Sequence, residues 1–150
     1  MGVYKRGIGD NNVSHAPKKF VTLYASAACT EGSFVSIDTG DSTNGLGYSV
    51  RDAEVGPGST AHNVKTFGVA TQTVAAGEDV IVQIAGKYEN ANVDGSTVAG
   101  TPLAGPLSGG TVGQAGILLE TTFGNVVAVA LEADTTNLAD VMIVNQGFFD

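Results

Sequence analysis

Few residues in this 150-residue chain could carry out catalysis. Nucleophilic catalysis needs a general base beside the nucleophile. The single cysteine, Cys29, lies among small residues with no histidine close in sequence, so we expect a small, buried and inert thiol. The two histidines, His15 and His62, belong to no motif that places a serine or an aspartate at a catalytic spacing, and we expect both at the surface or in loops. The sequence therefore predicts no active site and a protein that is not an enzyme.

Two loops carry oxygen ligands of the kind that a cation binds. Asn90, Asn92 and Asp94 stand at alternate positions before a glycine, as in the first half of a calcium-binding loop. The twelfth position of that loop is Thr101 rather than a bidentate glutamate, so we expect these side chains to stabilise a turn instead. The loop Asp38–Asn44 has two carboxylates at no recognised ligand spacing. The sequence does not decide whether this loop binds an ion. The sequence predicts no cofactor.

The composition favours an all-β fold. The chain has 21 glycines, no tryptophan and only 15% charged residues, which is unlike the composition of helical bundles. Short Val- and Thr-rich runs separated by glycine-containing turns are typical of many short strands. We therefore predict a compact β-sandwich or a small β-barrel of short antiparallel strands. The strand-like runs are 20–24, 34–37, 48–50, 67–71, 80–84, 102–103, 116–119, 126–131 and 141–144.

Two segments of the chain are similar to each other. Residues 68–86 and 128–147 each contain a strand-like run, a loop, an aspartate, a second run and a glycine. Such pairs of strands can build a small barrel or sandwich with approximate internal symmetry. Convergent use of the same turn chemistry explains the similarity equally well.

The charge is unevenly distributed along the chain. Residues 1–19 carry four basic and one acidic side chain, whereas residues 20–150 carry three basic and fourteen acidic ones. We therefore predict an extended basic N-terminal arm over 1–19 and a β-rich body over 20–150. Either the arm contacts an acidic protein surface or it is an ordinary solvated tail. The candidate contact residues in the arm are Lys5, Arg6, Lys18 and Lys19.

Charge and hydropathy also argue against nucleic-acid binding, secretion and a membrane-spanning helix. An acidic body repels nucleic acid, because affinity for DNA comes mostly from lysine and arginine at the phosphates. The start of the sequence lacks the apolar region of a signal peptide, and one cysteine suits a reducing cytosol. The uncharged stretch 95–119 contains seven glycines and two prolines, which argues against a membrane-spanning helix. We expect a protein made in a reducing cytosol, without nucleic-acid or membrane partners.

The order of the strand-like runs resembles that of the capsid cement, or head decoration, proteins of tailed bacteriophages. The segment 67–93 is similar to their "Gly-Val-Ala … Ala-Gly … Val-x-Val-x-x-x-Gly" pattern. The runs 129–133 and 139–144 resemble the strand pair that closes it. The likeness covers about residues 65–146 and rests on common residue types.

This resemblance implies a structural role in the virion, for a protein made in the cytoplasm of a bacterial host. It implies a protein that binds the outside of a phage head, bridges neighbouring major capsid protein subunits and forms a homotrimer. Binding only to the assembled shell would stabilise that shell. The alternative is a head-fibre base, or a tail-associated module that binds a host-surface receptor or glycan.

Overall fold

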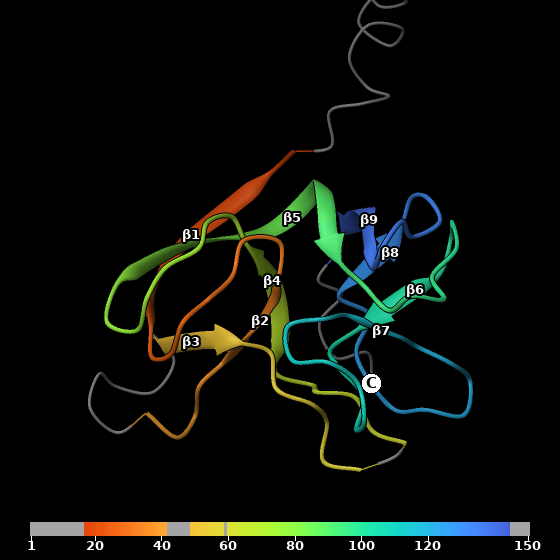
Figure 1. Ribbon diagram of the computed structural model, residues 1–150, viewed down its shortest axis with the longest axis horizontal. Helices are drawn as coiled ribbons and strands as arrows, with labels where there is room; N and C mark the ends of the chain where they lie inside the picture. The colour runs from red at the N-terminus through yellow and green to blue at the C-terminus, as the bar shows by residue number, and fades with distance from the viewer. Residues whose placement is uncertain (1–16, 42–48, 59, 145–150) are drawn as a thin grey trace, which may run out of the picture.

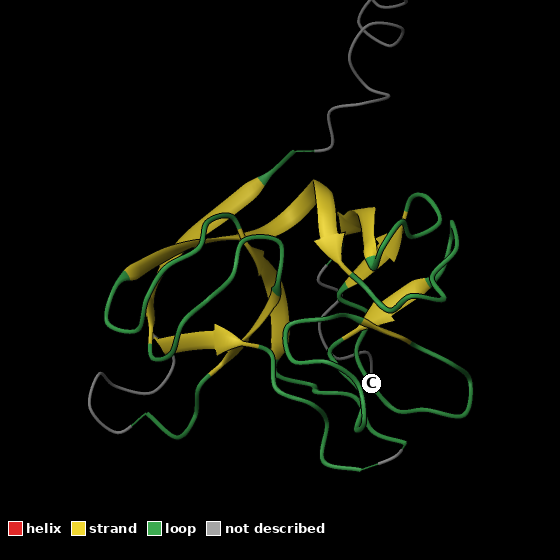
Figure 2. Cartoon of the chain, in the orientation of Figure 1, coloured by secondary structure: helices red, strands yellow, loops and turns green. Residues whose placement is uncertain are grey.

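The computed structural model describes residues 17–41, 49–58 and 60–144 of the chain. Within these residues the chain forms nine strands and no helix (Figures 1 and 2). Val, Ile and Thr fill the strands, and glycine or Asx residues fill the turns between them. The strands are β1 (Lys19–Ala25), β2 (Phe34–Ile37), β3 (Ser49–Asp52), β4 (Thr66–Ala70), β5 (Asp79–Asn92), β6 (Pro102–Ala104), β7 (Gly116–Ile117), β8 (Ala128–Ala130) and β9 (Leu138–Ile143).

The first five strands close into a small barrel. They follow the order β1-β3-β2-β4-β5, and β5 pairs back with β1, for example at Val21↔Val82. The β1–β3 pair is parallel, and the other four pairs are antiparallel. Figure 1 shows this barrel in the half of the molecule that carries the labels β1 to β4.

Strand β5 joins the barrel to a second sheet. It is 14 residues long, and its first half pairs with β1 and β4 while its second half pairs with β9. The sheet then continues in the order β9-β8-β6-β7. Gly86 lies at the change of partner with a φ of 91°, a left-handed conformation that glycine adopts without steric cost.

The two halves have separate hydrophobic cores. The barrel interior holds Val35, Val50 and Val82 together with the fully buried Cys29. The second core lies between the outer wall of the barrel and the second sheet. There Phe34 and Val69 of the barrel belong to one cluster with Leu103, Val141 and other residues of the second sheet. Because both cores are built from apolar side chains in contact, burial of apolar area holds the barrel and the second sheet together.

The all-β prediction is confirmed, and the observed body is a barrel with an added sheet rather than a sandwich. Two details differ from the prediction. The β1–β3 pair is parallel, and β5 is long, because one strand serves both sheets. Both similar segments form antiparallel pairs, β4–β5 and β8–β9, and β5 pairs directly with β9. Most of the predicted arm lies outside the described residues, and Lys19 is the first residue of β1.

Candidate binding surfaces

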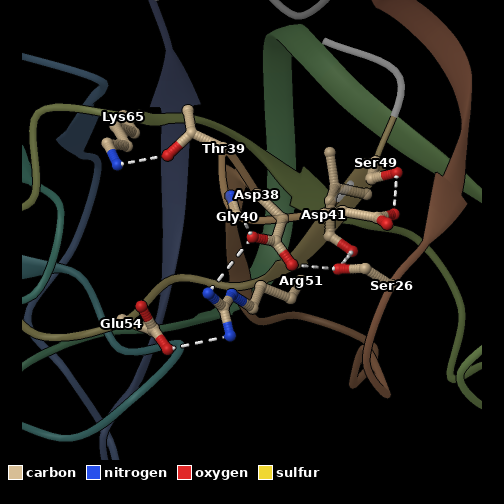
Figure 3. Close-up of polar contacts among 10 residues, drawn as sticks. Ser26, Asp38, Thr39, Gly40, Asp41, Ser49, Arg51, Glu54 and Lys65 are labelled. Atoms are coloured by element: carbon tan, nitrogen blue, oxygen red, sulfur yellow. Dashed lines mark hydrogen bonds and ion pairs between the residues drawn. The ribbon is translucent and has the colours of Figure 1, made fainter. Parts of the chain in front are cut away.

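A polar network closes one end of the barrel around Asp38 (Figure 3). Asp38 follows β2 and is only 8% exposed. The Ser26 hydroxyl donates to its Oδ2 at 2.7 Å, and the Gly40 N–H donates to its Oδ1 at 2.9 Å. Arg51 on β3 donates to the same Oδ1 at 3.2 Å. These bonds, first that of Ser26, hold the pKa of Asp38 below its usual range although burial opposes them.

Beside this network lies a hollow of about 340 Å³, called hollow one here. Its apolar wall includes Ile37, Val55, Pro57 and Val64, of which Val55 and Val64 are 40% and 45% exposed. Its charged side chains are those of Arg51, Glu54 and Lys65. The hollow thus combines apolar surface with charged side chains of both signs.

The two cations of hollow one differ in how they are paired. Arg51 is neutralised by Asp38 and by Glu54, whose Oε1 lies 3.0 Å from Nη1. Lys65 donates from Nζ to the Thr39 hydroxyl at 2.8 Å and forms no ion pair with any described residue. The described residues include five basic and thirteen acidic side chains, a net charge of −8. Lys65 is therefore an uncompensated cation on an acidic body.

His62 was expected at the surface or in a loop, and of these two placements the structure shows the loop but not the surface. It does lie in a loop region, but its side chain is 1% exposed, and it contributes to the walls of hollow one and of a second hollow. Nδ1 lies 2.7 Å from the Gly105 carbonyl oxygen, which can only accept, so Nδ1 donates. Nε2 lies 3.1 Å from the Thr122 hydroxyl. Gly116 and Gly124 make room for the ring and its Cβ. The arrangement fits a packed structural histidine.

The predicted arm residues fall into two groups. Lys5 and Arg6 lie outside the described residues, as does His15. Lys18 and Lys19 are described, exposed and without an ion pair to any described residue. The backbone at Lys18 runs against Gly86, and Lys19 pairs with Ala85 on β5. The candidate contact residues that can be placed therefore lie together at the start of β1, beside the bend of β5.

The two loops considered for cations show ordinary turn chemistry where they are described. Asp94 Oδ1 accepts the Ser96 N–H at 3.0 Å, as expected for an Asx turn, while Asn90 and Asn92 belong to β5. In the other loop the Asp38 carboxylate accepts hydrogen bonds from three donors. Part of the Asp38–Asn44 range lies outside the described residues. Across residues 17–41, 49–58 and 60–144, no group of three His, Cys, Asp or Glu side chains is placed to hold a metal ion.

Cys29 is the buried thiol that the sequence predicts. Its side chain is fully buried in the barrel core, and burial, with a smaller effect of Asp52, raises the pKa of the thiol to about 11. A thiol with this pKa is protonated at neutral pH and is a poor nucleophile.

Hollow one was not predicted from the sequence. Its walls come from residues 36–39, 51–57 and 61–65, which become neighbours only through the pairing of β3 and β4 with β2. The one local signal was Lys65, a lone basic residue between long stretches without lysine or arginine.

In the part of the chain that the structure describes, no helix has the length and apolar character needed to cross a membrane.

Comparison with known proteins shows a likeness of fold. The sequence matches no protein-family model and no curated protein. Among solved structures, the chain is similar to the N base of the head fiber protein gp8.5 of bacteriophage phi29, with a TM-score of 0.52. The similarity covers 89% of this chain and 100% of that chain at 16% sequence identity. At this identity the likeness shows a common fold.

Proposed function

We propose that the chain is a non-enzymatic structural protein of a phage virion that binds the outside of the head. The observation that carries the proposal is the fold shared with a head fiber base, which extends over the whole of that solved chain. The sequence pattern of 65–146 points independently to head decoration proteins. Fold alone does not determine function, so the proposal also rests on the surfaces of this chain.

An exposed basic pair supports a bridging role between neighbouring major capsid protein subunits. Lys18 and Lys19 lie where β1 begins, at the top of the view in Figure 1, and a homotrimer would present this pair at three separate places. A protein that ties two subunits together needs two separate contact surfaces. Binding that occurs only on the assembled shell stabilises the shell by mass action. We propose a homotrimer as the binding unit, as in the resemblance above.

The second candidate function is a head-fibre base. The phi29 structure that shares the fold is itself the N base of a head fiber, which favours this candidate specifically. A fibre base would anchor a projecting receptor- or glycan-binding part and would need only one strong contact with the shell. Both candidates place the chain on the virion exterior and need no cofactor.

Heads of the phage that encodes the chain provide the test. Purified chain should co-sediment with expanded heads, and cryo-electron microscopy should show density for it on their outer surface. If the chain bridges subunits, its addition should raise the temperature at which heads release DNA. If it is a fibre base, it should bind without changing that temperature. A chain that stays in the supernatant at saturating concentration would contradict both candidates.

A further inference from the structure

We propose that hollow one of one copy binds the β8–β9 turn, residues 131–138, of a second copy. This contact would hold the proposed homotrimer together, so the inference rests on that part of the proposed function and not on head binding. Hollow one offers exposed Val55 and Val64 beside the unpaired ammonium of Lys65. Its occupant should therefore present an apolar side chain next to a carboxylate.

The β8–β9 turn has this chemistry. Leu131 and Leu138 are 43% and 39% exposed at its two ends. Glu132 and Asp134 lie between them, and neither carboxylate pairs with a described cation. The acidic start of β5 also has an exposed apolar residue, Ile81, but it lies within the barrel wall, where β1 pairs with it. Only a projecting turn can enter a concave site.

The backbone of the turn is also unusual. Thr135 and Leu138 exchange backbone hydrogen bonds of 2.7 and 3.1 Å around a two-residue loop. The central residues Thr136 and Asn137 have φ angles of 54° and 64°, as in a type I′ hairpin turn. Asparagine is favoured there, whereas a β-branched threonine is an outlier that costs about 1–3 kcal/mol. Such strain clusters at functional sites and agrees with a turn that has a binding role.

The turn and the hollow of one chain cannot meet. The β8–β9 turn lies at the upper right of Figure 1, and the loops around hollow one lie at the bottom, with β6 and β7 of the second sheet between them. The contact must therefore form between two molecules. Because it joins two different surfaces, it is heterologous, and in the proposed homotrimer three such contacts would close a ring.

Sedimentation velocity of the full chain at micromolar concentration tests the contact. We expect the wild type to sediment as a closed oligomer. Lys65→Glu and Leu131→Ser should each weaken self-association at least tenfold. Gln72→Glu and Leu119→Ser are the controls, since they add a carboxylate or remove an apolar side chain at exposed residues outside the contact, and they should leave the oligomer intact. Equal weakening by the controls would overturn the proposal.

Two further experiments test the contact by a gain of association, which a variant that is merely destabilised would not show. An equimolar mixture of Lys65→Glu and Leu131→Ser chains retains one intact hollow and one intact turn per pair, so it should give dimers that cannot close. Lys65→Glu combined with Glu132→Lys in one chain should restore the oligomer. The proposed contact is wrong if the wild type stays monomeric or if the mixture forms no dimers. It is also wrong if the double variant Lys65→Glu, Glu132→Lys does not form the oligomer. A monomer that still co-sediments with heads would leave head binding standing.

Discussion

Nη2 of Arg51 lies 3.2 Å from Oδ1 of Asp38, and this ion pair connects β3 to the loop that follows β2. Asp38 is almost fully buried, so its charge is stable only because Ser26, Gly40 and Arg51 all donate to it. The same guanidinium also contacts Glu54 on the rim of hollow one. One buried carboxylate therefore orders both the barrel end and the edge of the proposed binding surface (Figure 3).

Replacement of Asp38 by Asn should lower the free energy of unfolding by about 1–3 kcal/mol, because a charged acceptor in a buried network is lost. Urea denaturation at pH 7 measures the change. Asp79→Asn is the matched control, since it removes one negative charge from an exposed site at the start of β5. An equal loss in both variants would show that the network around Asp38 does not stabilise the barrel.

The stability of the wild type should fall in acid. The pKa of Asp38 is lowered first by Ser26, and that of Asp140 is lowered first by Lys87, both from an ordinary value of 3.8. A carboxyl whose pKa is lower in the folded state stabilises the fold above its unfolded pKa, and this stabilisation disappears as the pH falls through the folded pKa.

Asp52 acts in the opposite direction, because burial raises its pKa. The decisive measurement is therefore the difference between wild type and Asp38→Asn. This difference should be constant from pH 7 to about 5 and should shrink below 3.8. A difference that persists at the lowest pH where the protein is folded would show that the charge of Asp38 contributes nothing.

The sequence predicted the strands better than it predicted the surface they create. The run 34–37 matches β2 residue for residue, because its pattern of Phe, Val and Ile is set locally. The full length of β5 was missed, since Gly86 and the polar residues 87–92 interrupt the apolar alternation that identifies a strand. These residues are in a strand because β9 pairs with them, which is tertiary information.

The burial of His62 was missed for a related reason. Its pocket is made by Gly105, Gly116 and Gly124, which are 43 or more residues away along the chain. Nothing in the local sequence Thr60–Asn63 distinguishes a buried histidine from an exposed one. The barrel closure and the hollow beside it depend on the same kind of long-range pairing.

Gly116→Ala should destabilise the fold by about 1–3 kcal/mol, because an added methyl group overpacks a filled site. A Cβ on Gly116 would lie 3.0 Å from Cε1 of His62 and 3.3 Å from the Gly105 carbonyl oxygen. Gly58→Ala is the matched control, since a Cβ there has no neighbour within 4 Å. Thermal unfolding of both variants checks the prediction, which is wrong if the two have the same melting temperature as the wild type.

Cys29 should react slowly with thiol reagents in the folded protein. Its pKa of about 11, compared with an ordinary value of 9.0, reduces the thiolate fraction near pH 8 by about 100-fold, and burial restricts access further. The absorbance change with Ellman's reagent should therefore be at least 100-fold slower in buffer than in 8 M urea. Similar rates in the two solutions would mean that the barrel core opens readily.

Deletion of residues 2–16 should leave a folded body that binds heads more weakly. Among the described residues every strand begins at or after Lys19, so circular dichroism and the urea midpoint of the deletion variant should match those of the full chain. The removed segment contains Lys5 and Arg6 and, if extended, can reach about 50 Å, far enough to contact a neighbouring subunit. Co-sedimentation with heads over a range of chain concentrations measures the loss of affinity.

The charge of the arm can be separated from its other contacts. Replacement of Lys5, Arg6, Lys18 and Lys19 by Gln removes the positive charges and keeps the length of the segment. Exposed ion pairs contribute only about 0–1 kcal/mol each, and salt screens them. The Gln variant should therefore bind heads more tightly than the deletion variant, and its defect should be largest at low salt. If the deletion variant binds heads as tightly as the full chain at every salt concentration, residues 2–16 make no contact with the shell, and head binding depends on the body alone.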